Sequence, residues 1–162
     1  MTNKEKALAL IGTFASGDTE KAKELLAEGY IQHNLAYGTG AGAFVGAVEY
    51  LASAPVKTTV NNIRAFEDGD KVFLQTVYNF AGTGEKVAFD IFRFDSEGKI
   101  AEHWDNYIQH NTAIADGLSG LGAALSAFYD LFRVENGKIA EHWDVMETIA
   151  DKTTWQNQNG KF

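Results

Sequence analysis

The sequence has no cysteine, a single proline and fewer basic than acidic residues. Without thiols, neither disulfides nor thiolate chemistry can contribute, and the chain is compatible with any redox compartment; we expect a cytoplasmic protein. The 14 basic residues against 22 acidic ones give a formal charge of -8, which opposes binding to nucleic acid and to anionic membranes. We therefore expect neither partner.

Long hydrophobic runs are also missing. Residues 1–6 lead into an amphipathic pattern, not into a continuous apolar run that ends at a cleavage site, so we expect neither a signal peptide nor a membrane span. The 162 residues can form one domain or a domain with an appendage, and the 45% of hydrophobic residues can supply a core.

The first third of the chain predicts three helices. Thr2 and Glu5 have the spacing of a capping box, and apolar residues follow at helical intervals. Residues 18–29 predict a second helix, which begins with an aspartate cap and ends at a glycine. Residues 44–54 predict a third helix, which Pro55 terminates.

After the proline, β-branched and aromatic residues predict strands. Residues 56–80 form a hairpin pattern around an acidic, glycine-containing turn, and residues 89–105 form a second one around Ser-Glu-Gly-Lys. Three helices followed by antiparallel strands predict an α+β domain over residues 1–105, in which a curved antiparallel sheet wraps the helices. We expect a pocket between the two layers.

The second hairpin places acidic side chains opposite each other. Antiparallel pairing about its turn sets Asp90 against Asp105 and Phe92 against His103. Directly opposed like charges are unfavourable, so this pair needs a shared proton or a functional reason. The opposite face is expected to carry Ile91, Arg93, Ile100, Glu102 and Trp104.

Parts of the chain are then repeated. Residues 107–111 copy 30–34 (Tyr-Ile-Gln-His-Asn), and 129–144 copy the second hairpin with one residue fewer in its turn. Because the first motif lies 107 − 30 = 77 residues later and the second 130 − 90 = 40, the copy is shorter by 77 − 40 = 37 residues. We expect 106–162 to be a truncated second repeat, made of a short turn, a helix over 118–128, one hairpin and a tail.

Such a fragment cannot bury its own apolar face. We expect it to pack on the first domain, with its hairpin extending or replacing part of the sheet, or to exchange with another chain. In an alternative interpretation, residues 106–109 continue the strand from His103, and the copied motif is a strand there but a short turn at 30–34.

The motifs at 30–34, 90–93 and 98–105 resemble the SnoaL-like polyketide cyclase family, whose cone-shaped fold is shared with nuclear transport factor 2. The resemblance covers residues 3–105 and, with the gap, 107–162. It implies an intramolecular aldol ring closure without metal or organic cofactor. The same fold also hosts isomerases, hydrolases and noncatalytic binders.

The resemblance also implies roles for single residues. Asp105 corresponds to the acid/base aspartate, Asp90 occupies a position that is often a histidine, and His33 corresponds to a histidine that faces the pocket. Ring closure needs a base that removes a proton between two carbonyls and a donor that stabilises the enolate. Our candidates are Asp105, Asp90 and His33 for catalysis, and His103, Phe92 and Tyr30 for substrate binding.

In this hypothesis Asp105 is the base, and Asp90 is protonated and donates or shares its proton. Burial beside a second carboxylate raises a carboxyl pKa toward neutrality, which makes a better base. The structural alternative is that Asp90 caps a turn and Asp105 ends a strand in water. A metal site of His33, His103 and Asp105 has only its spacing in favour, so we expect no metal.

Together these patterns predict a cofactor-independent lyase or isomerase for a small apolar carbonyl ligand, forming a homodimer through the exposed sheet face. The alternative is a noncatalytic ligand-binding or assembly protein of the same fold. The copied site residues are not expected to enclose a second working pocket, because a site needs a supporting shell; they are His110, Asp130, His142 and Asp144.

Overall fold

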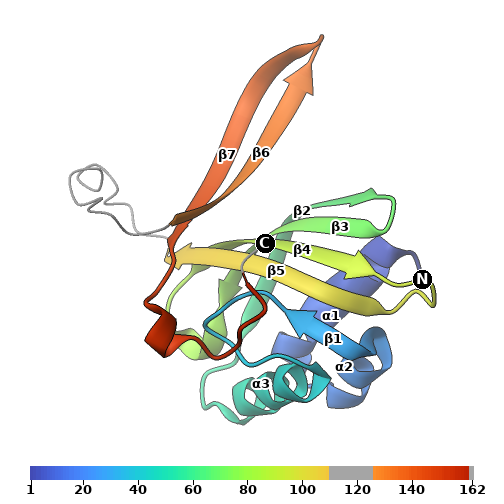
Figure 1. The fold of residues 1–162 in the computed structure, drawn as a ribbon, viewed down its shortest axis with the longest axis vertical. Helices are drawn as coiled ribbons and strands as arrows, with labels where there is room; N and C mark the ends of the chain where they lie inside the picture. Colours follow the sequence, from blue (N-terminus) through green and yellow to red (C-terminus); the bar gives the residue numbers. More distant parts are fainter. Residues whose placement is uncertain (110–125, 161–162) are drawn as a thin grey trace.

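The computed structural model describes residues 1–109 and 126–160. Its three helices lie on one face of a curved five-stranded sheet, and a two-stranded hairpin projects from the molecule (Figure 1). The strand order is β1-β5-β4-β3-β2 in the large sheet and β6-β7 in the small one. The elements are α1 (Asn3–Ser16), α2 (Thr19–Leu25), β1 (Leu26–Gln32), α3 (Ala41–Ser53), β2 (Thr59–Asp68), β3 (Lys71–Asn79), β4 (Lys86–Phe94), β5 (Ile100–Gln109), β6 (Ser126–Glu135) and β7 (Lys138–Thr148), with short 3-10 helices at Phe80–Gly82 and Lys152–Thr154.

The α+β class and the three helices are confirmed. Helix α1 begins with the predicted capping box, in which the Thr2 hydroxyl accepts from the Glu5 backbone and the Glu5 carboxylate accepts from the Thr2 backbone. It ends at Gly17, whose φ of 76° is left-handed. A Cβ there would lie 2.8 Å from that of Ala52, so the glycine also permits the close approach of α3.

Residues 26–34 differ from the prediction. Helix α2 stops at Leu25, and the predicted turn at 30–34 lies in and just after strand β1, which runs parallel to β5. The sheet is therefore mixed, not purely antiparallel. The local helix signal does not persist, because pairing with β5 satisfies the backbone of this segment and buries its apolar side chains. The predicted helix end at Gly29 is thus wrong.

Both predicted hairpins form, as β2–β3 and β4–β5. The predicted opposition of Asp90 to Asp105 and of Phe92 to His103 is confirmed. Ile100 is an exception, because a register shift after Arg93 pairs it with Phe94. Ile100 is fully buried on the helix side of the sheet, whereas we expected it on the opposite face with Arg93.

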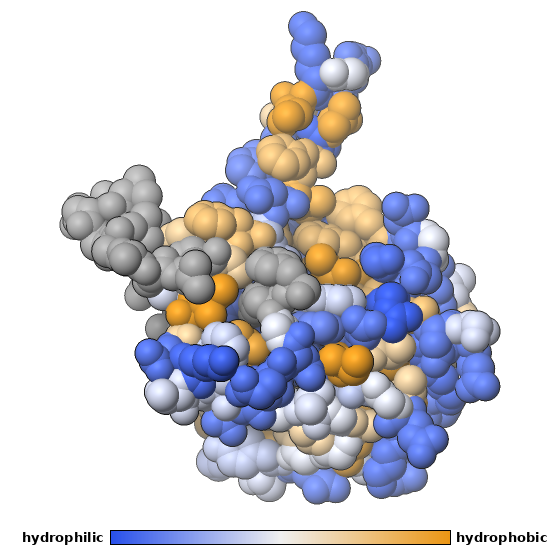
Figure 2. Space-filling view, in the orientation of Figure 1, coloured by the Kyte–Doolittle hydropathy of each residue, from blue (hydrophilic) through white to orange (hydrophobic). Residues whose placement is uncertain are grey.

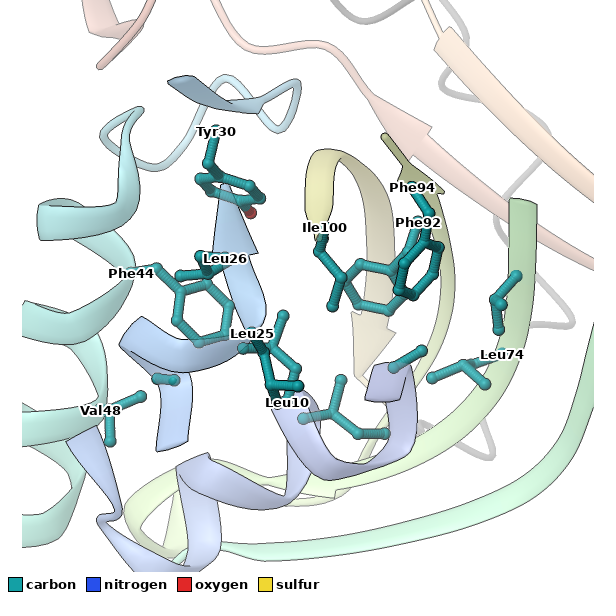
Figure 3. Close-up of a cluster of buried hydrophobic side chains, with 14 of the residues drawn as sticks. Leu10, Leu25, Leu26, Tyr30, Phe44, Val48, Leu74, Phe92, Phe94 and Ile100 are labelled. Carbon is teal, nitrogen blue, oxygen red and sulfur yellow. The ribbon is translucent and has the colours of Figure 1, made fainter. Parts of the chain in front are cut away.

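The main core lies between the helices and the concave face of the sheet (Figure 3). Helices α1 and α3 contribute Leu10 and Val48, and strand β3 contributes Leu74. Phe92 and Phe94 come from β4. Because these side chains are nearly inaccessible to water, they provide most of the apolar burial that holds the two layers together.

Hairpin β6–β7 has the register of β4–β5, with Asp130 opposite Asp144 and Phe132 opposite His142. It forms a sheet of its own. The prediction that it extends or replaces part of the first sheet is therefore wrong: β4 and β5 keep their places, and the base of the new hairpin covers their outer face. Buried side chains there are Phe89, Ala127, Tyr129 and Val145.

The outer half of this hairpin carries exposed hydrophobic side chains. Figure 2 shows hydrophobic residues along the projection, and Phe132, Val134 and Ile139 are exposed.

Of the helix predicted over 118–128, residues 118–125 lie outside the described residues, and 126–128 belong to β6. The alternative in which 106–109 continue a strand is confirmed, since β5 runs to Gln109.

The C-terminal tail returns to the segment that follows β1. The Asn157 side chain donates 2.9 Å hydrogen bonds to the carbonyls of Asn34 and Tyr37, and the Asn159 side chain donates one of 2.8 Å to the Gln32 carbonyl. The tail thus stabilises the loop beside the pocket.

No helix among residues 1–109 and 126–160 is long and apolar enough to cross a membrane. The homodimer stays a prediction.

The two equivalent phenylalanines give a matched test of this packing. Phe92 is 0% exposed and Phe132 is 47% exposed. We expect Phe92→Ala to lower the free energy of unfolding by about 3–5 kcal/mol, because it leaves a cavity in the core. Phe132→Ala is expected to cost about 1 kcal/mol or less. Urea denaturation measures both, and equal losses would contradict the assigned packing.

Candidate active site

A cavity of about 340 Å³ opens between the helices and the concave face of the sheet. Most of its wall is apolar or aromatic, and six of its polar side chains form one group, a combination typical of small-molecule sites. The apolar wall includes Phe14, Phe44, Ala47, Leu51, Phe80 and Ala88. The polar group consists of Tyr30, Gln32, Tyr78, Asp90, His103 and Asp105.

Asp90 is held by two donors. The Tyr78 hydroxyl donates to Asp90 Oδ2 at 3.0 Å, and His103 Nε2 lies 3.1 Å from Asp90 Oδ1. Asp90 is only 3% exposed, so these bonds replace water for a buried carboxylate. Two donors fit an ionised group better than a protonated one. We therefore prefer an ionised Asp90 to the hypothesis that it is protonated and donates or shares its proton.

The tautomer of His103 follows from its neighbours. The Gln32 side-chain oxygen accepts from the Asn34 backbone at 2.9 Å, which turns the Gln32 amide nitrogen toward His103 Nδ1 at 3.1 Å. Because an amide nitrogen only donates, Nδ1 is the acceptor and the ring proton sits on Nε2. From Nε2 it is donated to Asp90. Tyr30 lies 3.2 Å from the same Nδ1 and donates there as well.

Asp105 lies beside this network from the neighbouring strand. Its Oδ2 accepts a 3.1 Å hydrogen bond from the side chain of Asn34, and the carboxylate is only 7% exposed. It also lines the cavity, as Asp90 does. The alternative in which Asp90 caps a turn and Asp105 ends a strand in water is therefore wrong, because both are buried in the middle of their strands.

The two phenols at this end of the cavity stay protonated to high pH. Burial raises the pKa of Tyr30 well above its usual value, and the charges of Asp105 and Asp90 raise it further. Burial likewise raises the pKa of Tyr78, with the charge of Asp90 and its hydrogen bond adding to the effect. Both hydroxyls are thus reliable hydrogen-bond donors at neutral pH.

The opposite end of the cavity is lined by aromatic side chains and one ammonium group. The hydroxyls of Tyr37 and Tyr107 are hydrogen-bonded to each other, which joins the loop after β1 to strand β5. The Lys86 ammonium lies 4.9 Å from the ring centroid of Tyr107. Tyr37 is 37% exposed, so this end is closer to solvent than the buried carboxylates.

The structure does not bring His33 to the cavity. Its ring stacks on Trp104 at 4.4 Å, its Nε2 lies 3.0 Å from Glu102, and its Nδ1 lies 3.1 Å from the Gly160 carbonyl. His33 is thus part of the opposite side of the sheet. The reason is strand alternation: Tyr30 and Gln32 point into the cavity, so His33 points away from it.

Phe92 also does not line the cavity. It is fully buried beneath His103, with the two rings stacked at 4.2 Å. It supports the imidazole but cannot contact a substrate from that position. Of the six predicted site residues, the structure gathers Tyr30, Asp90, His103 and Asp105 around one end of the cavity.

A metal ion would find three ligand groups here. Ligand atoms of Asp90, His103 and Asp105 all lie within 4.8 Å of one another. The donor types suit a divalent transition metal, but His103 Nε2 carries a proton in this arrangement, and a metal needs its lone pair. Binding would require the ring proton to move to Nδ1 and the Gln32 amide to turn over. The residues as arranged do not fit a metal.

Sequence reasoning missed Gln32 and Asn34 as parts of the site. Both residues belong to the motif 30–34, but we predicted a turn there. A turn, unlike a strand, does not place successive side chains on opposite faces. Had the segment been assigned as a strand, Tyr30 and Gln32 would have been placed on one face and His33 on the other.

The SnoaL-like domain model matches residues 7–103 of this chain. That range includes Tyr30, Gln32, Asp90 and His103, and it ends two residues before Asp105. No curated protein matches the chain.

Solved structures with this fold include three that illustrate its range. An NTF2-like protein of unknown function from Cytophaga hutchinsonii is 18% identical, with a TM-score of 0.57 over 67% of this chain and 91% of its own. IdmH from Streptomyces antibioticus, a candidate polyketide cyclase, is 22% identical, with a TM-score of 0.55 over 66% and 92%. An LEH-like epoxide hydrolase of M. tuberculosis is 14% identical, with a TM-score of 0.57 over 65% and 82%. These similarities establish the NTF2-like fold.

The tautomer of His103 can be measured. Long-range ¹H–¹⁵N NMR spectra should identify His103 as the Nε2–H form in the wild-type protein. In Gln32→Glu, an acceptor replaces the amide donor next to Nδ1, so a proton should appear on Nδ1. His142, whose Nε2 lies 2.7 Å from Asp130, is an internal control and should not change. An unprotonated Nε2 in the wild type would refute the assignment.

The buried phenols predict a loss of stability at alkaline pH. Because the folded-state pKa of Tyr30 is raised, its contribution is fully present below the ordinary phenol value of 10.0 and is lost as the pH rises above it. Denaturation from about pH 9 to about pH 11 should therefore show a smaller decline for Tyr30→Phe than for the wild type. Tyr50→Phe removes a hydroxyl from a side chain that is 73% exposed and serves as the control. Parallel declines in all three would contradict the prediction.

Proposed function

Because the chain belongs to the SnoaL-like domain family, we propose that it is a small-molecule lyase or isomerase that uses acid/base chemistry on a carbonyl compound. The observation that carries the proposal is the apolar cavity in which Asp105 lies next to a hydrogen-bonded Asp90–His103 pair and two protonated phenols.

The proposed reaction is an intramolecular aldol closure with Asp105 as the base. Asp105 takes the proton from a carbon between two carbonyl groups, and the electron pair of that C–H bond moves onto a carbonyl oxygen to form an enolate. The enolate carbon then bonds to a second carbonyl carbon of the same molecule. Protonated Asp105 returns its proton to the new alkoxide, so the product is a ring bearing a hydroxyl group.

The enolate oxygen needs a donor, and Tyr30 is the best placed one. Its hydroxyl lines the same end of the cavity, and its raised pKa keeps it protonated. It already lies 3.2 Å from His103 Nδ1, and the substrate oxygen replaces that acceptor. The Asp90–His103 pair positions the hydroxyl. Asp90 therefore acts as an ionised partner of His103.

The apolar wall accounts for the choice of substrate. Aromatic side chains such as Phe14, Phe44 and Phe80 surround the space in which the rest of the molecule lies. They favour a flat, apolar compound and exclude water from the enolate.

The test compares two equivalent aspartates. In D₂O, the wild-type protein should catalyse deuterium uptake at the carbon between the carbonyls of β-keto esters, followed by NMR. Asp105→Asn should reduce this rate by about 10²- to 10⁴-fold, because the base is lost. Asp144→Asn makes the same change at the copied position in hairpin β6–β7 and should retain the full rate.

Full activity in Asp105→Asn would remove this residue from the base role. If no β-keto ester exchanges faster with protein than without it, yet the esters bind in the cavity, the chain is the noncatalytic binder of the alternative hypothesis.

A further inference from the structure

Lys86 is the one lysine or arginine among the described residues that line the cavity. It lies on β4, four residues before Asp90, so alternation places both side chains on the concave face. Its ammonium nitrogen is 4.9 Å from the ring centroid of Tyr107 and 5.9 Å from that of Phe80. A cation is thus held against two aromatic rings inside an apolar space.

Lysine in such a place normally has an acidic partner. Within residues 1–109 and 126–160, however, no carboxylate lies within ion-pair distance of Lys86. Aromatic rings attract the ammonium but do not neutralise it. Lys86 therefore offers a positive charge to whatever fills the cavity.

Lys86 begins strand β4, and Asp90 lies at its middle. Four strand residues span roughly 13 Å, which is the separation of the backbone positions of Lys86 and Asp90. Asp90 is buried, whereas Lys86 is half-buried and lies beside Tyr107. The cavity consequently has an acidic inner end and a basic outer end, with an apolar wall between them.

We propose that the ligand of this cavity carries a carboxylate that binds Lys86, on the order of 10 Å from the carbonyl group at the inner end. The ligand class is therefore a flat, apolar keto acid, oriented by its charge. Repulsion from Asp90 and Asp105 opposes the reversed orientation, and Lys86 favours the productive one. The proposal rests on the proposed function for the place of the reacting carbonyl, but the binding of the anion does not depend on catalysis.

The experiment uses two probes of nearly equal shape, biphenyl-4-carboxylate and the neutral biphenyl-4-carboxamide. Isothermal titration calorimetry with the full chain should give about tenfold tighter binding of the carboxylate by the wild type. Lys86→Met should abolish this preference while keeping the apolar stem of the side chain. Lys86→Arg should retain it, because the charge remains.

Lys71→Met is the control, since Lys71 is exposed and pairs with Asp70 outside the cavity. It should leave both affinities unchanged. A carboxylate preference that persists in Lys86→Met would overturn the proposal, and so would a wild type that binds the carboxamide equally well or binds neither probe at millimolar concentration. Because the readout is equilibrium binding, a failed deuterium-exchange assay would leave this result intact.

Discussion

The parallel pairing of β1 with β5 is the constraint on which the rest of this site depends. It sets Gln32 beside His103 in the sheet and carries Asn34 to the carboxylate of Asp105. Every polar contact that determines the state of His103 comes from this pairing or from the adjacent hairpin. Since the two strands are separated by about seventy residues of sequence, only the folded sheet brings these groups together.

Burial of two carboxylates in one apolar cavity is unfavourable unless donors compensate for the lost water. The structure supplies them from three places, which are strand β3, strand β5 and the loop after β1. Tyr78 on β3 and His103 on β5 donate to Asp90, and Asn34 donates to Asp105. Asp90 is thereby committed to hydrogen bonds with its neighbours. Asp105 lies beside this pair and lines the cavity, and we propose it as the group that exchanges protons with a ligand.

The hairpin β6–β7 shows how little of this chemistry belongs to the hairpin itself. It reproduces the contact between His142 and Asp130 and the stacking of His142 on Phe132 at 4.4 Å. Yet these side chains are exposed, and no helix or counterpart of β1 within residues 1–109 and 126–160 covers that face. The same local sequence therefore gives the same local geometry, while enclosure and the additional donors come only from the packing around it.

The sequence by itself determined the helix cap at Thr2, the two hairpins of the main sheet and the opposition of Asp90 to Asp105, because these follow from contacts between near neighbours and from strand alternation. Only the tertiary structure decided that residues 26–32 are a strand, that His33 faces Glu102 and Trp104, and that the copied hairpin packs on the outer face of the sheet. The physical reason is that these outcomes depend on pairing and burial between segments far apart in the chain. Their stabilisation is not encoded in any single stretch of residues.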